Sequence, residues 1–353
     1  MITISKEIEL APGYDVGKIG PLNELVFFDI ETTGFTPYTS NLYLIGVVYH
    51  QSGSWQLKQW FADSMAAEQE LLTSFFQFIT KYKTLVHFNG DSFDIPYLKK
   101  CAAQYGISPT FHQVQSFDIY RKARPLRRLL GLENLKQKSI ETFLGLDRFD
   151  QFNGGQLIEC YKEYLTTKDN KLYQFLLLHN EEDLKGMPQI LTILDYLDIL
   201  HSDWVMESHR LDGDSSHLFV DVTSQIQLPV PFQFACTQFQ LYAERNTLHF
   251  SIPVYQAELK YFYGNYQNYY YLPQEDRAVH KRVAQYVDKG HRQQATAATC
   301  YIKRQGLFLP GIDCDDLFPI FRSDYHSKVY YHEYVDDTDF INTYLHQMLL
   351  AFC

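Results

Sequence analysis

The chain has 353 residues, of which 46% are hydrophobic and 21% charged, and its formal net charge is −11 at pH 7. This composition excludes a disordered or fibrous protein, and the length predicts about two globular domains. No stretch reaches the roughly 18 apolar residues that a membrane span needs, and the N-terminus lacks a basic segment followed by an apolar run. We therefore expect a cytoplasmic protein that does not enter a membrane.

Two basic windows interrupt the acidic background. Residues 118–138 hold seven basic and two acidic side chains, a net of +5, and residues 277–304 hold seven basic and one acidic side chain, a net of +6. Such segregation can bind phosphates locally even in an acidic protein. A solvated helix face produces the same pattern, so charge alone does not decide.

Residues 1–22 contain prolines and glycines that break any long element, so we expect a leading N-terminal arm. Residues 25–34 read Leu-Val-Phe-Phe-Asp-Ile-Glu-Thr-Thr-Gly, which predicts a buried strand that delivers two acids near its end. Side chains two apart in a strand share a face, so Asp29 and Glu31 lie side by side. The two carboxylates repel each other unless a divalent cation lies between them. The alternative is that they only cap the following turn.

Three more elements follow in a regular pattern. Residues 41–49 and 55–61 predict strands joined by a Gln-Ser-Gly-Ser hairpin turn, which gives three antiparallel strands with the first. An apolar stripe predicts a helix over residues 65–80, and residues 84–88 predict another buried strand.

The stretch Asn-Gly-Asp-Ser-Phe-Asp then predicts a turn at Asn89 and a helix with Asp94 in its first turn. Helix capping explains an acid there in any protein. The same geometry, however, aims Asp94 towards the strand end that carries Asp29 and Glu31.

The rest of the first half is helical in pattern. Helices are predicted over residues 132–144 and 156–165, and a long helix runs from residue 171 past residue 197. Within it, His179 and Asp183 are four apart and share one helix face. The pair is either a local hydrogen bond on a solvated face or a titratable pair at the edge of the core.

Three acidic motifs thus follow in a fixed order: Asp-Ile-Glu-Thr-Thr-Gly at residues 29–34, Asn-Gly-Asp-Ser-Phe-Asp at 89–94 and His-Asn-Glu-Glu-Asp at 179–183. In these motifs the chain resembles the DEDD-type 3′-to-5′ exonucleases of the RNase H-like (DnaQ-like) superfamily. It is most similar to their YprB-like branch of predicted exonucleases. The resemblance covers roughly residues 22–200 and implies an α/β fold, with an RNase H-like mixed sheet flanked by helices over residues 23–203.

The resemblance also implies a metal site and a substrate. Four acids are expected to hold two divalent ions, Mg²⁺ or Mn²⁺, and to hydrolyse DNA or RNA from a single-stranded 3′ end: Asp29, Glu31, Asp94 and Asp183. Asp29 is the expected bridge between the ions. Two metals about 4 Å apart supply both an activated water and stabilisation of the leaving alkoxide.

Candidate substrate contacts surround these acids. Thr33 and Asn89 lie where family members contact the terminal nucleotide. Phe35 is a candidate for stacking on a base, or an ordinary turn hydrophobe. Arg124 is the candidate from the first basic window. Asp118 is a spare acid at a predicted strand end, and we expect it to hold a neighbouring arginine rather than a metal.

His179 departs from the family pattern. DEDD enzymes carry either a Tyr four residues before the last acid or a His five residues before it, whereas here a His stands four residues before Asp183. An imidazole accepts a proton from water near neutral pH, which an unperturbed Tyr does not do readily. His179 is therefore the candidate general base, unless it only orients the water.

Residues 204–353 predict a C-terminal α+β accessory domain without a catalytic motif. A tyrosine-rich run at residues 261–271 precedes residues 275–289, which predict a basic helix. An aromatic sheet beside a basic helix can bind single-stranded nucleic acid, with Lys281 and Arg282 as phosphate contacts. Ordinary strand packing or a protein-partner surface explains the tyrosines as well.

Two rival functions fit the same residues. One is a non-catalytic nucleic-acid-binding or scaffolding protein on an exonuclease fold, which has no need to keep four acids and a histidine. The other is an endonuclease or nucleotide-processing enzyme that uses the same metal site. The sequence does not identify a protein partner.

Overall fold

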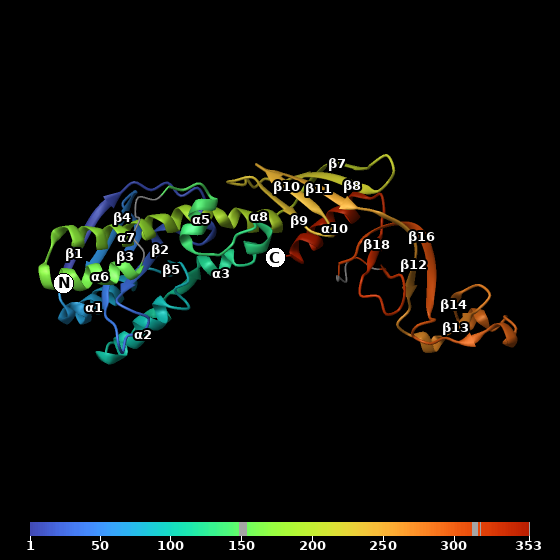
Figure 1. Cartoon of the computed structure of the whole chain (residues 1–353), viewed down its shortest axis with the longest axis horizontal. Helices are drawn as coiled ribbons and strands as arrows, with labels where there is room; N and C mark the ends of the chain where they lie inside the picture. Colours follow the sequence, from blue (N-terminus) through green and yellow to red (C-terminus); the bar gives the residue numbers. More distant parts are fainter. Residues whose placement is uncertain (148–153, 313–316, 318, 353) are drawn as a thin grey trace. The chain divides into compact units, whose positions relative to one another are not determined.

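The computed structural model describes residues 1–147, 154–312, 317 and 319–352 (Figure 1). The chain divides into two compact units, Met1–Leu197 and Asp198–Cys353, which we call unit 1 and unit 2. The boundary falls within one short helix, α8 (Asp195–His201). Among the described residues, no helix combines the length and the apolar character needed to cross a membrane.

Unit 1 is built on a six-stranded mixed sheet in the order β1-β4-β3-β2-β5-β6. The pairs from β1 to β2 in this order are antiparallel, and β5 and β6 continue parallel to β2. The predicted hairpin and the predicted buried strands are confirmed. The strands are β1 (Ile2–Ile8), β2 (Leu25–Thr32), β3 (Leu42–Gln51), β4 (Ser54–Phe61), β5 (Thr84–His87) and β6 (Gln115–Asp118).

Helices cover both faces of this sheet (Figure 1). On one face α1 (Glu68–Ile79) packs against β3 and β4 and contacts α2 (Asp94–Gln104). On the other face α7 (Asn170–Ile190) packs against β2 and β3 and contacts α5 and α6. The fold is therefore the RNase H-like α/β arrangement that the sequence predicts. The remaining helices are α3 (Ile119–Ala123), α4 (Leu126–Leu129), α5 (Gln137–Phe143) and α6 (Gly154–Thr167).

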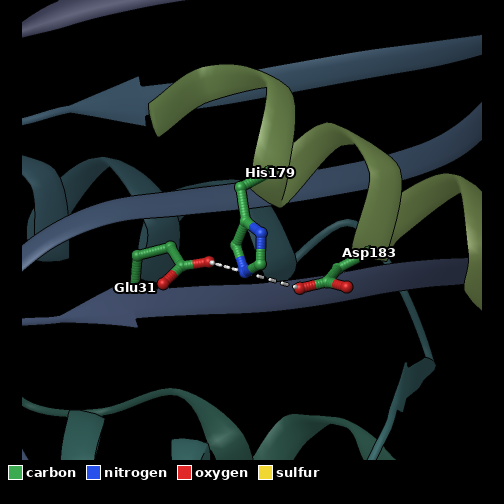
Figure 2. Close-up of side chains that lie close together, drawn as sticks. All are labelled: Glu31, His179 and Asp183. Carbon is green, nitrogen blue, oxygen red and sulfur yellow. Dashed lines mark ion pairs between the residues drawn. The ribbon is translucent and has the colours of Figure 1, made fainter. Parts of the chain in front are cut away.

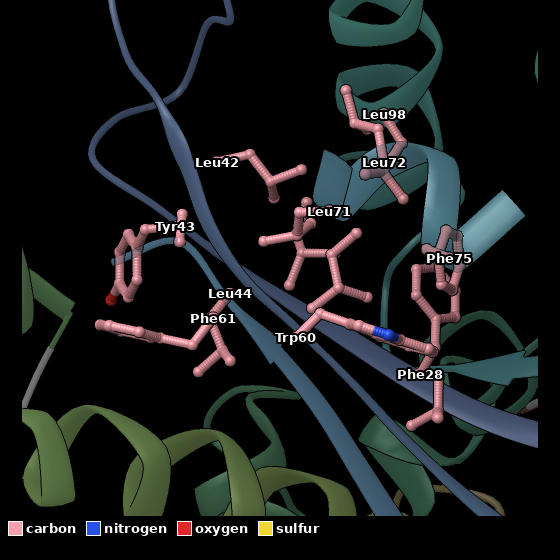
Figure 3. Packing of buried hydrophobic residues seen from close by; sticks show 14 of the residues in the cluster. Phe28, Leu42, Tyr43, Leu44, Trp60, Phe61, Leu71, Leu72, Phe75 and Leu98 are labelled. Carbon is pink, nitrogen blue, oxygen red and sulfur yellow. The ribbon is translucent and has the colours of Figure 1, made fainter. Parts of the chain in front are cut away.

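Strand β2 has opposite chemistry on its two faces. Val26, Phe28 and Ile30 are buried in the main core of unit 1, where the Phe28 ring lies 5.5 Å from the Phe75 ring of α1 (Figure 3). Because successive strand residues point to opposite faces, the intervening Asp29 faces α7. The apolar face thus anchors a strand whose other face ends in acids.

The segment expected to be a free N-terminal arm instead contributes the edge strand of the sheet. β1 pairs with β4 from Ile2 opposite Phe61 to Ile8 opposite Trp55. The Lys6 ammonium also lies 2.6 Å from the Glu181 carboxylate of α7. The short alternation of isoleucines is the sequence signal for this strand, and its partner lies far away along the chain.

Two predicted helices are shorter than expected. The side-chain oxygen of Asn134 accepts a hydrogen bond from the Lys136 backbone N–H at 2.9 Å, which keeps residues 132–136 in a turn, so α5 begins only at Gln137. The long helix α7 ends at Ile190, two residues after Pro188, and a 3₁₀ turn follows it. Proline removes a backbone donor and crowds the preceding turn, which favours a break there.

Unit 2 is rich in strands. It contains a five-stranded sheet in the order β7-β8-β11-β10-β9, a four-stranded sheet β12-β16-β18-β17 and a three-stranded sheet β14-β13-β15, with the helix α10 (Thr338–Leu350) near its end. The strands are β7 (Val205–Leu211), β8 (His217–Thr223), β9 (Phe232–Ala235), β10 (Gln240–Glu244), β11 (Thr247–Pro253), β12 (Tyr255–Phe262), β13 (Tyr269–Leu272), β14 (Arg277–His280), β15 (Gln293–Gln294), β16 (Tyr301–Pro310), β17 (Ile320–Phe321) and β18 (Tyr331–Glu333).

The prediction of a basic helix over residues 275–289 is wrong. Residues 277–280 form β14, which pairs with β13, and only the single turn α9 (Lys281–Ala284) is helical. Asp276 explains the difference, because its carboxylate accepts hydrogen bonds from Tyr271 and Tyr301 and lies 2.6 Å from the Lys303 ammonium. These contacts fix a hairpin turn where a helix would have started.

Phe61 is the residue whose truncation tests the core of unit 1 most simply. It is fully buried, and its ring lies 5.9, 5.2 and 5.1 Å from the rings of Tyr161, Tyr164 and Tyr173. We expect Phe61→Ala to lower the free energy of unfolding by about 3–5 kcal/mol, because the cavity cannot be refilled. Urea unfolding measures this, and a loss below about 1 kcal/mol would contradict the packing described.

The matched control for this substitution is Phe35→Ala. The Phe35 side chain is 92% exposed, so its truncation should change the free energy of unfolding by less than about 0.5 kcal/mol.

Candidate metal and nucleic-acid site

The first two acids come from the end of β2. Asp29 and Glu31 are on the face of the sheet that α7 covers, and the ladder between β2 and β3 becomes irregular between Glu31 and Thr32. Beyond this point Thr33 pairs its backbone N–H with the Asn41 carbonyl at 2.9 Å. The strand thus stops where its carboxylates reach the edge of the core.

Helix α7 brings a third acid and a histidine to these carboxylates (Figure 2). The Nε2 atom of His179 lies 3.5 Å from Glu31 Oε1 and 3.4 Å from Asp183 Oδ2. One ligand-type atom from each of the three residues falls within 4.8 Å of the others. The His179–Asp183 pair is therefore at the edge of the core beside β2, and not on a solvated helix face.

Asp94 enters from the start of α2. The chain leaves β5 at His87 and turns through Asn89, whose φ of +61° is a left-handed conformation that Asn tolerates better than most residues. Asp94 itself is 8% exposed. Burial raises the pKa of Asp94 to about 7, although backbone N–H groups of Asp94 and Ile30 partly oppose that rise. The charges of Asp118 and then Asp183 add to the increase, so Asp94 and Asp183 belong to the same electrostatic cluster.

Asp29 has the most crowded carboxyl of the cluster. Burial raises its pKa well above the usual range, and the charges of Asp183, Glu31 and Asp94 raise it further. A buried carboxyl whose ionised form is destabilised by the charges of three neighbouring acids is typical of a site that a cation completes. Hard divalent cations such as Mg²⁺ and Mn²⁺ take carboxylate oxygens as ligands, so the residues fit such an ion.

A cavity of about 570 Å³ opens beside two of these acids. Its wall combines acidic, aromatic and basic side chains: Asp29, Ile30, Phe88, Asn89, Phe93, Asp94, Tyr120, Arg127, Asn134, Leu135, Lys136 and Gln137. The first basic window therefore contributes Arg127 and Lys136 to the same wall as the acids. The sequence indicated the window, but not which of its cations face the cavity.

The predicted substrate contacts of unit 1 have different surroundings. Asn89 lines the cavity, and its backbone N–H donates to Asp118 at 2.9 Å. Phe35 is exposed and its ring lies 6.2 Å from the ring of Phe93, which does line the cavity. The Thr33 hydroxyl accepts the Asn41 backbone N–H at 2.8 Å. Arg124 is exposed at the end of α3 and is not one of the lining residues.

The other predicted residues are structural or belong to unit 2. Asp118 caps α3, and its carboxylate lies 3.9 Å from the Arg121 guanidinium, as expected for a structural acid. Lys281 lies with its ammonium 5.3 Å from the centre of the Tyr270 ring. The Arg282 backbone N–H donates to the His280 ring at 3.3 Å and leaves its exposed side chain available.

The sequence did not single out Tyr43, whose hydroxyl donates to Glu31 Oε2 at 3.3 Å, or two amide residues that also contact the cluster. Asn180 donates from Nδ2 to Asp29 Oδ2 at 2.8 Å. Gln137 donates from Nε2 to the Asp183 backbone carbonyl at 2.8 Å. Asn180 lies inside the motif His-Asn-Glu-Glu-Asp, but nothing in the sequence distinguishes an amide that faces the core from one in solvent.

Comparison with known proteins agrees with the fold. A family model of the RNase H superfamily matches residues 26–195, a range that includes all four acids and His179. No curated protein matches the chain.

Some solved structures are similar at low identity. The family B DNA polymerase of the archaeon Pyrobaculum calidifontis is 14% identical over 56% of this chain and 29% of that one, with a TM-score of 0.42. A zinc-bound complex of E. coli exonuclease I with single-stranded DNA is 11% identical over 57% and 54%, with a TM-score of 0.31. A product-bound exonuclease I is 13% identical over 57% and 58%, with a TM-score of 0.30. The chain thus spans less than a third of the polymerase and little more than half of exonuclease I.

The acidic cluster predicts an unusual effect of removing a charge. In metal-free protein at pH 8, Asp29→Asn should raise the free energy of unfolding, because the variant no longer carries a buried charge among acidic neighbours. A carboxyl whose folded pKa is raised loses stability as the pH climbs through the range above its unfolded value. The gain should therefore be small near pH 4 and larger at pH 8.

Urea unfolding in the presence of a chelator at both pH values measures this gain. Glu7→Gln, which neutralises an exposed acid of β1, is the control and should change stability by less than about 0.5 kcal/mol. A variant Asp29→Asn that is less stable than the wild type at pH 8 would contradict the crowding of buried charge.

Proposed function

We propose that unit 1 is a metal-dependent nuclease that hydrolyses phosphodiester bonds of DNA or RNA from a single-stranded 3′ end. The observation that carries the proposal is the buried cluster of four acids and a histidine next to a cavity with two cations in its wall. The match of residues 26–195 to the RNase H superfamily supports it, because that range contains the entire cluster. The motifs that resemble DEDD exonucleases of the YprB-like branch support the 3′-to-5′ polarity.

The acids would hold two divalent ions, Mg²⁺ or Mn²⁺, and the ligands would be Asp29, Glu31, Asp94 and Asp183. When bound, such ions lower the pKa of water and stabilise negative charge on phosphate oxygens. In the protein itself, repulsion among these carboxylates and the burial of Asp29 favour cation uptake. The acids therefore bind and orient, and they need no proton of their own for the reaction.

His179 would take the proton from the attacking water. Its Nε2 lies between the carboxylates of Glu31 and Asp183, which hold the ring beside the proposed metal ligands. Histidine is the side chain most often used to transfer a proton to or from a reacting group.

The cavity wall would hold the substrate. Arg127 and Lys136 supply cations for phosphates, and Asn89 supplies an amide beside the acids. Phe93 and the exposed Phe35 offer aromatic faces for bases, which stack on aromatic rings without regard to sequence. The proposal therefore replaces Arg124 with Arg127 and Lys136 as the phosphate contacts of unit 1.

Hydrolysis of end-labelled single-stranded DNA and RNA with Mg²⁺ or Mn²⁺ tests the proposal. We expect a ladder that shortens from the 3′ end and disappears when a chelator is added. We expect Asp183→Asn to abolish it, and His179→Ala to lower the rate by about 10²–10⁴, the range for loss of a general base. His112→Ala, an exposed histidine outside the cavity wall, is the control and should keep the wild-type rate.

The other outcomes separate the rival functions. Internal cuts would indicate an endonuclease, and binding without cuts would indicate a non-catalytic nucleic-acid-binding protein. Either result would contradict the proposed exonuclease. A rate for His179→Ala within threefold of the wild type would remove only the role of this residue.

We further propose that the second basic window, which lies in unit 2, binds the single strand and does no chemistry itself. Lys281 and Arg282 lie on the turn α9, next to an exposed Tyr286 and to Tyr270. Arg292 places a second cation 4.9 Å from the centre of the same Tyr270 ring. Cations interleaved with aromatic rings are the combination that binds single strands.

Salt dependence tests this role of unit 2. Each phosphate contact with a single strand contributes about −0.7 to the slope of log affinity against log salt. Lys281→Ala combined with Arg282→Ala should flatten that slope by roughly 1.4 and weaken binding of all sequences alike. The control pair Lys99→Ala with Lys100→Ala removes two exposed cations of α2 outside the cavity wall. An unchanged slope in the first variant would contradict the role.

A further inference from the structure

Gly46 on β3 lies between Asp29 of the candidate site and the buried glutamine Gln59. In the register of the sheet, Gly46 is paired with Asp29 on β2 and with Gln59 on β4. Directly paired residues share a face, so all three positions face α7. The three neighbours are a candidate metal ligand, Asp29, then a residue without a side chain, Gly46, and then a buried amide, Gln59.

Asn180 of α7 occupies the space above that glycine. A Cβ atom added at Gly46 would lie 2.0 Å from Asn180 Oδ1 and 2.4 Å from Leu184 Cδ1. Neither contact is possible without displacing α7 or turning the amide. Glycine at this position is therefore what allows the amide of Asn180 to lie flat on the sheet between its two neighbours.

Hydrogen bonds fix the amide of Asn180 in one orientation. Its Oδ1 accepts from Gln59 Nε2 at 2.9 Å, and its Nδ2 donates to Asp29 Oδ2 at 2.8 Å. The same Gln59 nitrogen also donates to the Leu177 backbone carbonyl at 3.0 Å. Rotating the Asn180 amide by half a turn would place oxygen against carboxylate and nitrogen against nitrogen, which breaks both bonds at once.

Burial makes this orientation costly to lose. Asn180 is 0% exposed and Gln59 is 1% exposed, so water cannot replace either partner. A buried amide that loses its partner is left unsatisfied, whereas a surface amide exchanges its partner for solvent. The side-chain amides of Gln59 and Asn180 thus rigidly connect the helix backbone at Leu177 to one oxygen of Asp29.

We infer that Asn180, locked by Gln59, is a positioning residue that holds the Asp29 carboxylate in the orientation in which it binds a divalent cation. The inference rests on the proposed function, because it assumes that Asp29 is a metal ligand. Residues that hold metal ligands by hydrogen bonds commonly alter metal affinity by 10-fold to 100-fold when they are removed. Asn180 would therefore act on the cation through Asp29, to which it donates a hydrogen bond.

Calorimetric titration of the full chain with Mn²⁺ tests the inference without relying on activity. Asn180→Ala should weaken Mn²⁺ binding by about 10-fold to 100-fold. Leu176→Ala is the matched control, because Leu176 is a buried apolar residue one turn earlier on the same helix. It should destabilise the fold while leaving the Mn²⁺ dissociation constant within threefold of the wild type.

A second variant keeps the test decisive if Asn180→Ala does not fold. Gln59→Met keeps the length of the side chain and leaves Asn180 and Asp29 in place, but it removes the donor that locks the Asn180 amide. We expect Mn²⁺ binding to weaken by about threefold to 10-fold, less than on loss of Asn180 itself.

The outcomes distinguish this inference from the function on which it rests. If the wild type binds no Mn²⁺, both the proposed metal site and the inference that rests on it are wrong. If the wild type binds Mn²⁺ and Asn180→Ala or Gln59→Met binds it equally well, only the positioning role is overturned. Equal weakening in Leu176→Ala would also overturn it, because the effect would then follow general loss of packing.

Discussion

The structure of unit 1 is arranged around one constraint. This constraint is the repulsion among the carboxylates that lie near the end of β2. Asp29 and Asp94 both have raised pKa values, chiefly because they are buried and also because their acidic neighbours oppose ionisation. A protein that needed only a stable core would place apolar side chains there, since buried unpaired charge is costly. The arrangement becomes favourable once a divalent cation shares these oxygens.

Several features of the fold follow from holding these charges in place. The opposite face of β2 is apolar and packs Phe28 against Phe75, so the strand is anchored from behind. Helix α7 approaches the sheet closely over Gly46, which brings His179 and Asp183 to the carboxylates. The buried Glu181 of α7 contacts Lys185 and, through Lys6, the edge strand β1, each at 2.6 Å. The helix is therefore fixed at the same turn from which the candidate site residues His179 and Asp183 project.

The sequence alone predicted the elements whose signals are local. The alternation in β2, the β3–β4 hairpin and the acid at the start of α2 each depend on neighbours a few residues apart, and the structure contains all of them. Spacing also placed His179 and Asp183 on one face of a helix. Their meeting with Glu31 required the strand order of the sheet, which the three motifs indicated only through a family resemblance.

Other features depend on partners far along the chain. β1 has a weak pattern of its own and becomes a strand because β4 offers an open edge. Residues 277–280 have a composition that suits a helix, yet the hydrogen bonds of Asp276 and pairing with β13 fold them as a strand. A window of seven cations likewise does not reveal that Arg127 and Lys136 face the cavity. Asn180 could not be identified, because its role depends on a glycine and a glutamine of two other strands.

The central claim is that the acids of β2, α2 and α7 form one site for divalent cations, and diffraction from crystals soaked in Mn²⁺ tests it most directly. Anomalous difference maps locate manganese without any assumption about activity or substrate. The account predicts manganese peaks among the carboxylates of Asp29, Glu31, Asp94 and Asp183, with the side chain of Asn180 still bonded to Asp29. Peaks confined to other surfaces, or no peak beside Asp29 at millimolar Mn²⁺, would contradict it.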